Sequence, residues 1–181
     1  MRNFESAAFA AALALGGFAS AASATTFVYD FSSNDGTENA TGRLTATANG
    51  NGTFTAISGT IDASGPLASG TGTLTSNASA PAASYSPSGA FTYDDQLLPG
   101  QNPLITNPGL LFKIGGTEVN IFSNGPGPGT YSLDTWAGGY GYQTGNFTLS
   151  AVPEPASWAM MLIGFGLIGS MMRASRKPAT A

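Results

Sequence analysis

The chain has 181 residues, no histidine, no cysteine and a formal net charge of −4. Without histidine and cysteine it cannot form a Ser-His-Asp triad, a thiol nucleophile, a disulfide or an ordinary zinc site. Its six basic residues are too few to neutralise a phosphate backbone, so no nucleic-acid partner is expected.

Residues 1–24 have the layout of a secretory signal peptide. Arg2 precedes an alanine- and leucine-rich run over residues 7–19, and the small residues Ala22 and Ala24 follow it. This order of a basic start, an apolar run and a small-residue cleavage site is typical of export signals. We expect cleavage directly after Ala24, which predicts that the rest of the chain is exported.

Residues 25–151 are expected to form one exported, acidic, β-rich domain. The segment keeps two basic residues, Arg43 and Lys113, and eight of the ten acidic ones, so its charge is about −6. It shows short runs of alternating apolar and polar residues between Gly, Asn, Pro and Ser, and no stretch with helical spacing. The pattern predicts an antiparallel β-sandwich or a jelly-roll-like fold.

Two hairpins stand out in this segment. The Asn-Gly-Asn-Gly turn at residues 49–52 and the Gly-Gly pair at 115–116 each lie between predicted strands, as expected for tight turns with positive φ. For residues 65–89 the sequence is compatible with either a long loop or an irregular pair of strands. The predicted strands are 26–31, 43–48, 53–57 with a continuation over 59–62, 90–93, 110–114, 117–122, 130–136 and 146–151.

Carboxylates are the main reactive groups that remain. Asp94 and Asp95 are adjacent, so on a strand they would point to opposite faces, and nothing selects any pair of acids as catalytic. Hard oxygen ligands for calcium are present at Asp30, Asp35, Glu38, Asp94 and Asp95, with residues 32–36 as the best local candidate. The favoured interpretation of residues 32–36 is a surface turn. We therefore expect no enzyme, no metal site and no cofactor.

Four aromatic residues cluster around glycines near the end of the domain: Tyr131, Trp136, Tyr140 and Tyr142. If exposed on a sheet rim, such rings could stack on sugars. The other interpretation is core and edge packing beside a bulge or tight turn.

The C-terminal segment, residues 152–177, combines three parts. Pro153 and Pro155 keep the backbone extended and present Glu154. The uncharged run 156–172 would span about 25 Å as a helix, near the lower limit for crossing a membrane. The transmembrane helix is expected to include Trp158, Met160, Leu162, Gly164, Phe165, Gly166, Gly169 and Met172, and the cytoplasmic basic flank is Arg173, Arg176 and Lys177.

This segment resembles the C-terminal sorting signal of bacterial PEP-CTERM proteins, in the variety with Pro-Glu-Pro, two residues and Trp-Ala. The resemblance implies processing by an exosortase, a membrane protease-transpeptidase, in a cell that makes surface polysaccharide. It also implies that the proline–glutamate–proline residues are recognised and are not catalytic. The matching residues are Pro153, Glu154, Pro155, Trp158, Ala159, Met160, Met161, Leu162, Gly164, Phe165, Gly166, Gly169 and Arg173.

The sequence thus predicts an exported, non-enzymatic cell-surface or extracellular-matrix protein. Its expected partners are the export machinery, an exosortase and the membrane, with transient anchoring at the inner membrane before delivery to the surface. Two alternatives remain open: a carbohydrate-binding module for surface polysaccharide, and a permanently membrane-anchored envelope protein.

Overall fold

The structure is a computed structural model that describes residues 24–153 and 161–166. Within these residues the domain is built from β-strands, as the sequence predicts, and a short helix covers 161–166. The strands are β1 (Thr25–Ser33), β2 (Asn39–Ala48), β3 (Phe54–Ser64), β4 (Gly70–Leu74), β5 (Ser84–Tyr85), β6 (Thr92–Tyr93), β7 (Gln96–Leu97), β8 (Leu110–Ile114), β9 (Thr117–Ser123), β10 (Tyr131–Trp136) and β11 (Tyr140–Val152).

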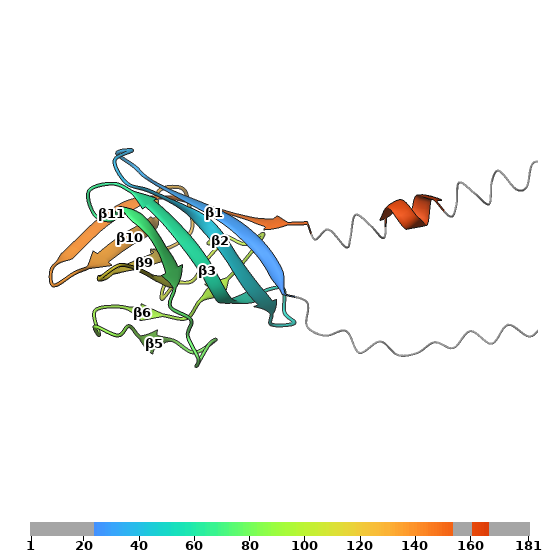
Figure 1. The fold of residues 1–181 in the computed structure, drawn as a ribbon, viewed down its shortest axis with the longest axis horizontal. Helices are drawn as coiled ribbons and strands as arrows, with labels where there is room; N and C mark the ends of the chain where they lie inside the picture. The colour runs from blue at the N-terminus through green and yellow to red at the C-terminus, as the bar shows by residue number, and fades with distance from the viewer. Residues whose placement is uncertain (1–23, 154–160, 167–181) are drawn as a thin grey trace, which may run out of the picture.

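Eight of these strands close into an antiparallel barrel (Figure 1). The ring runs β1, β11, β10, β9, β8, β4, β3, β2 and back to β1, and β7 adds to the outer edge of β3. The sandwich or jelly-roll prediction is therefore wrong. A sandwich and a barrel both bury one face of every strand, so the alternation of apolar and polar residues does not distinguish between them. What decides is the pairing of the first strand with the last, which the sequence pattern does not encode.

The two predicted hairpins are confirmed. β2 and β3 are joined by the Asn-Gly-Asn-Gly turn, in which Gly50 and Gly52 have φ of 81° and 83°. β8 and β9 are joined at Gly115, with φ of 58°. The segment left open by the sequence, 65–89, contains β4 and β5 within irregular backbone.

The last strand is longer than predicted, because β11 begins at Tyr140 and the expected strand began at 146. Its first half pairs with β10 and its second half with β1, and the change of partner occurs at Gly145. A Cβ at Gly145 would overlap the backbone of Ser32 and Ser33. The glycines that look like turn residues in the sequence therefore permit close strand packing.

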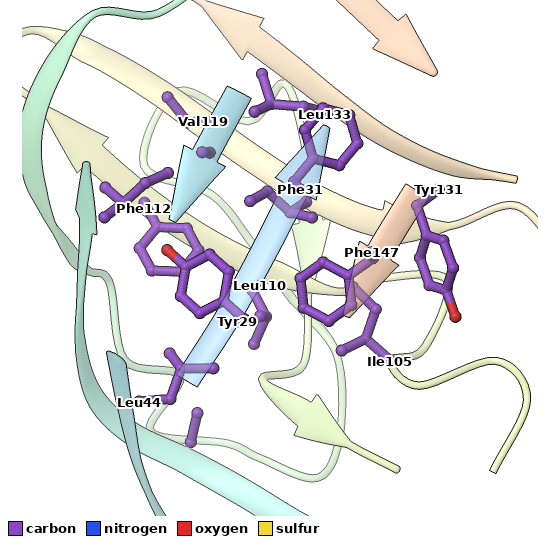
Figure 2. Packing of buried hydrophobic residues seen from close by; sticks show 14 of the residues in the cluster. Tyr29, Phe31, Leu44, Ile105, Leu110, Phe112, Val119, Tyr131, Leu133 and Phe147 are labelled. Atoms are coloured by element: carbon purple, nitrogen blue, oxygen red, sulfur yellow. The ribbon is translucent and has the colours of Figure 1, made fainter. Parts of the chain in front are cut away.

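The barrel interior is filled with side chains from all sides (Figure 2). Phe27, Tyr29 and Phe31 alternate along β1 and point inward, and the Tyr29 ring packs 5.6 Å from that of Phe112 and 5.7 Å from that of Phe147. Small residues on β2 face these large rings, so the layers interdigitate. The interior is a packed core.

One glycine sets how closely three strands approach. Gly42 on β2 lies beneath the Tyr29 hydroxyl, which donates a hydrogen bond of 3.0 Å to the Thr60 carbonyl oxygen on β3. A Cβ at Gly42 would overlap both that hydroxyl and that carbonyl. The packing of β1 across β2 onto β3 therefore depends on glycine at this position.

We predict that Gly42→Ala lowers the free energy of unfolding by about 1–3 kcal/mol, because the added methyl overpacks the wall of the barrel. Gly116→Ala is the matched control, since a Cβ there has no heavy atom within 4 Å. Urea unfolding followed by far-UV circular dichroism measures both. Equal midpoints for the two variants would contradict the packing assigned to Gly42.

Both ends of the barrel are covered by loop side chains. At one end the buried Glu38 carboxylate accepts hydrogen bonds from the amides of Leu67 and Ala68, at 2.9 and 3.1 Å. These bonds hold the β3–β4 loop over the opening. At the other end Ile105 is fully buried and bridges to Leu97.

The segment 75–109, between β4 and β8, forms a strap that packs on the outside of the barrel around Phe91 and Tyr93 and also sends Leu97 and Ile105 into the interior core. It contributes Phe91 and Tyr93, which pack on the outward-facing Leu111, with Trp136 against them. The strap therefore buries part of the outer face of β8, β9 and β10. Without it, this part of the barrel wall would be exposed to solvent. Polar residues of that wall are buried with it, and they form the candidate site.

Candidate functional site

Of the four aromatic residues expected to cluster, Trp136, Tyr140 and Tyr142 lie side by side on the outer wall, and Tyr131 lies apart from them in the barrel interior. Tyr131 points into the barrel, where its hydroxyl accepts a 2.9 Å hydrogen bond from the Leu104 amide, and Trp136 packs beneath the strap. Tyr140 and Tyr142 are 59% and 64% exposed, with ring centroids 6.2 Å apart. Because they lie two apart on one strand, these two share a face. The period-two rule could have selected this pair from the sequence.

Tyr140 borders a hollow of about 200 Å³ on the outer wall of the barrel, and Tyr142 lies next to Tyr140 on β11. Its floor is Asn120 of β9 and Asp134 of β10, which are direct cross-strand partners. The strap supplies one wall and Tyr140 the other, with the Phe91 and Tyr140 ring centroids 6.2 Å apart. The lining residues are Ala90, Phe91, Thr92, Asn107, Asn120, Phe122, Asp134 and Tyr140.

Asp134 is the chemically distinctive residue of this hollow. It is 3% exposed, its Oδ2 accepts a hydrogen bond from the Tyr140 hydroxyl, and its Oδ1 has no partner in the described part of the chain. Burial raises the pKa of the Asp134 carboxyl, and the Tyr140 hydrogen bond opposes that rise. Desolvation and then Asp134 raise the pKa of Tyr140 to about 12, so its hydroxyl is a donor at neutral pH.

Two carboxamides complete the polar lining. Asn120 Nδ2 donates to the carbonyls of Thr92 and Pro108, both at 3.2 Å, and Asn107 Nδ2 donates to that of Ser123 at 3.0 Å. These bonds tie the strap to the barrel wall and fix both side chains. Their carboxamide oxygens are the atoms that remain to meet a ligand. Nothing in the sequence pattern distinguished Asn107, Asn120 or Asp134.

The adjacent carboxylates Asp94 and Asp95 join distant parts of the strap to each other. Asp94 Oδ1 accepts hydrogen bonds from the Gln96 amide at 3.1 Å and the Thr106 hydroxyl at 2.5 Å. Asp95 Oδ2 accepts one from the Asn77 amide at 2.7 Å, while its Oδ1 is buried without a partner among the described residues. Neither lines the hollow. Burial raises the pKa of Asp94 and raises that of Asp95 to about 7.

We predict that the stability of the domain falls as pH rises from about 4 to about 7, and that Asp95→Asn removes part of this fall. The pKa of Asp95 is about 7 in the folded state and ~3.9 in the unfolded state. Its contribution to stability is therefore fully present at a pH below ~3.9 and is lost as the pH rises through about 7. The loss is at most about 4 kcal/mol. Urea midpoints across this pH range measure it.

Asp30→Asn is the control for that experiment, because Asp30 is exposed on β1. Its pH profile should follow that of the parent chain. If Asp95→Asn also kept the parent profile, the buried carboxylate would not be the source of the pH dependence.

The side chains of Asp35 and Glu38, considered above as calcium ligands, instead accept hydrogen bonds that stabilise a turn and a loop. Asp35 Oδ1 accepts hydrogen bonds from the Ser33 hydroxyl at 2.6 Å and from the Thr37 amide at 3.0 Å, which closes the β1–β2 turn. The Glu38 carboxylate binds loop amides as described above. Within residues 24–153 and 161–166, no three acidic side chains are placed to hold a metal ion. The surface-turn interpretation of residues 32–36 fits these bonds.

A second hollow, of about 490 Å³, lies on the outer face of β2, β3 and β4. Exposed threonines line it, together with Arg43 and Asp62. It is larger than the Asp134 hollow, but neither of the two buried, unpartnered side-chain oxygens found in the described chain belongs to its lining. The unpartnered oxygen of Asp134 therefore favours the smaller hollow as the candidate functional site.

Most of the predicted export and sorting residues lie outside the described residues. Ala24 is exposed directly before β1, and Pro153 is exposed directly after β11. Leu162, Gly164, Phe165 and Gly166 belong to the helix over 161–166. Outside the description are Ala22, Glu154, Pro155, Trp158, Ala159, Met160, Gly169, Met172, Arg173, Arg176 and Lys177. None of the helices described has the length and apolar character needed to span a membrane.

Comparison with known proteins identifies the C-terminal segment. The model of the PEP-CTERM protein-sorting motif matches residues 151–177, so the chain carries this motif and the predicted resemblance is confirmed. The match begins inside β11, where Ala151 pairs with Phe27 and Val152 with Thr26. No curated protein and no solved structure matches the chain.

Proposed function

We propose that the chain is an exported, non-enzymatic cell-surface or extracellular-matrix protein that an exosortase sorts and processes through its C-terminal motif. The match to residues 151–177 carries this proposal. The barrel supports it, because all its strands lie between Thr25 and Val152, clear of the predicted signal peptide. Removal of the segments on either side would leave the ring of strands complete.

The proposed order of events follows from the layout of the sequence. The signal peptide starts export, the apolar run halts in the membrane, and Arg173, Arg176 and Lys177 stay on the cytoplasmic side. The Pro-Glu-Pro segment then lies at the outer membrane face, within reach of the membrane protease. Since Pro153 directly follows β11, the folded barrel stands immediately beside it.

We predict that the mature C-terminus depends on the exosortase. Mass spectrometry should show a C-terminus cut within the sorting segment in cells with the enzyme and an intact sorting segment in cells without it. Glu154→Ala should reduce processing, because it removes the charged residue of the motif. Pro178→Ala, just beyond the matched residues, is the control and should be processed normally. An uncleaved tail in both cells would instead favour permanent membrane anchoring.

Carbohydrate binding is a second candidate function for the barrel. The observation that favours it is the pair of exposed rings, Tyr140 and Tyr142, beside a polar hollow. Aromatic faces pack against the C–H faces of sugars, while carboxylates and carboxamides meet their hydroxyls. Charge fits as well, since neither Arg43 nor Lys113 lines this hollow and an anionic ligand would meet Asp134.

We predict that the purified full-length protein binds the exopolysaccharide of the cell that makes it, and that replacing Tyr140 and Tyr142 together by Ala weakens binding about 30-fold. Each stacking ring is expected to contribute about 1 kcal/mol. Isothermal titration measures affinity, and Trp136 fluorescence reports on the adjoining cluster. Tyr85→Ala is the control, because Tyr85 is 77% exposed and lines neither hollow. Absence of both heat and fluorescence change would contradict this function.

A further inference from the structure

We propose that Asp134 is the polar anchor of a site for a single neutral sugar unit, and that the Tyr140 hydroxyl occupies the position that a sugar hydroxyl takes on binding. This inference rests on the proposed carbohydrate-binding function and assigns its residues and ligand class. The site is the 200 Å³ hollow between the strap and the outer wall of β9 and β10.

The first argument is the incomplete hydrogen bonding of Asp134. A buried carboxylate normally accepts several hydrogen bonds, because an unpaired oxygen in a protein interior is costly. Asp134 is 3% exposed and accepts a single bond, from Tyr140, while Oδ1 has no partner in the part of the chain that the structure describes. A ligand with adjacent hydroxyls would supply donors to both oxygens.

The second argument is that the single bond Asp134 accepts comes from an exposed side chain. Tyr140 is 59% exposed, and the aromatic contacts that its ring gives up on turning away are those with Phe91 and Tyr142. Its hydroxyl is an O–H donor at the carboxylate, the same group that a sugar presents. When the ring turns, Asp134 Oδ2 becomes open to the hollow and the ring face becomes available for stacking.

The third argument concerns size and the remaining lining. A hollow of about 200 Å³ is smaller than the roughly 300–1,000 Å³ typical of pockets for drug-sized ligands. It therefore suits one ring. Asn107 and Asn120 are held by their own hydrogen bonds to backbone carbonyls, so their oxygens are pre-oriented acceptors for further hydroxyls. Phe91 and Phe122 provide apolar walls.

Neutral sugars are favoured over ammonium ligands because the lining beside Asp134 is made of carboxamides and a hydroxyl, which match a polyol. An ammonium ion would donate to the same oxygens, but without a ring it would leave the apolar walls of Phe91 and Phe122 uncovered. A carboxylated or phosphorylated sugar would meet the buried carboxylate directly and be repelled.

The test uses the full-length protein in a detergent that contains no sugar. The probes are methyl glycosides of glucose, galactose, mannose and N-acetylglucosamine, with ethanolamine as the ammonium probe, measured by saturation-transfer NMR and calorimetry. We expect at least one glycoside to bind. Asp134→Asn should weaken it about tenfold or more, and Tyr140→Phe should tighten it a few-fold because the competing hydroxyl is gone.

Tyr85→Phe is the matched control, since Tyr85 is 77% exposed and lines neither hollow. Its affinity should stay within about twofold of the parent. Near-UV circular dichroism of each variant checks that the fold is unchanged, and Asp134→Asn keeps the shape of the side chain.

The possible failures are distinguishable. If Ala at both Tyr140 and Tyr142 weakens glycan binding but Asp134→Asn leaves it unchanged, the anchor is overturned and carbohydrate binding stands. If ethanolamine binds through Asp134 and no glycoside does, the ligand class is overturned. If neither the glycosides nor the polysaccharide bind, both proposals fall.

Discussion

The pairing of β1 with β11 is the constraint on which the rest of the structure depends. Eight residues of β1, from Thr26 to Ser33, lie opposite residues of β11 in antiparallel register. This ladder joins the two ends of the domain and turns an open sheet into a ring, which removes the exposed edges that sheets otherwise present. Inward-facing residues then meet across the ring, so a small chain without disulfides gains one continuous core.

Closure also explains why the outer wall can hold a site. In a closed barrel the inward faces already form the core, so an additional layer can pack only on the outside. The strap does this over β8, β9 and β10, and it buries Asn120 and Asp134 that would otherwise meet solvent. Because the body has so few basic residues, no cation among the described residues lowers the pKa of the buried carboxyls of Asp94, Asp95 and Asp134. Burial accordingly raises the pKa of Asp94, Asp95 and Asp134 together.

Local signals in the sequence predicted local structure well. The Asn-Gly-Asn-Gly turn, the Gly115 turn and the strands around them depend on neighbouring residues, and all are present. Barrel closure and the strap depend on contacts between distant segments, such as Thr26 with Val152 and Asn120 with Thr92, which periodicity does not report. For the site, the sequence indicated a cluster of aromatic residues, but it did not indicate that Tyr140 and Tyr142 share a face, because the predicted last strand began at 146. Asp134 gave no signal, because a lone aspartate on a strand ordinarily faces solvent.

The direction of β11 relates the two proposed functions to each other. Its last residues belong to the sorting motif, and its first residue, Tyr140, borders the hollow. Thirteen residues of strand span up to about 40 Å, at ~3.3 Å per residue. The strand therefore separates the hollow from the point where the sorting segment leaves the barrel. While the motif is held at a membrane, the exposed tyrosines would lie toward the distant end of the domain. A glycan outside the cell could then reach Asp134 both before and after the sorting segment is removed, because its removal does not change the end of β11 at Tyr140.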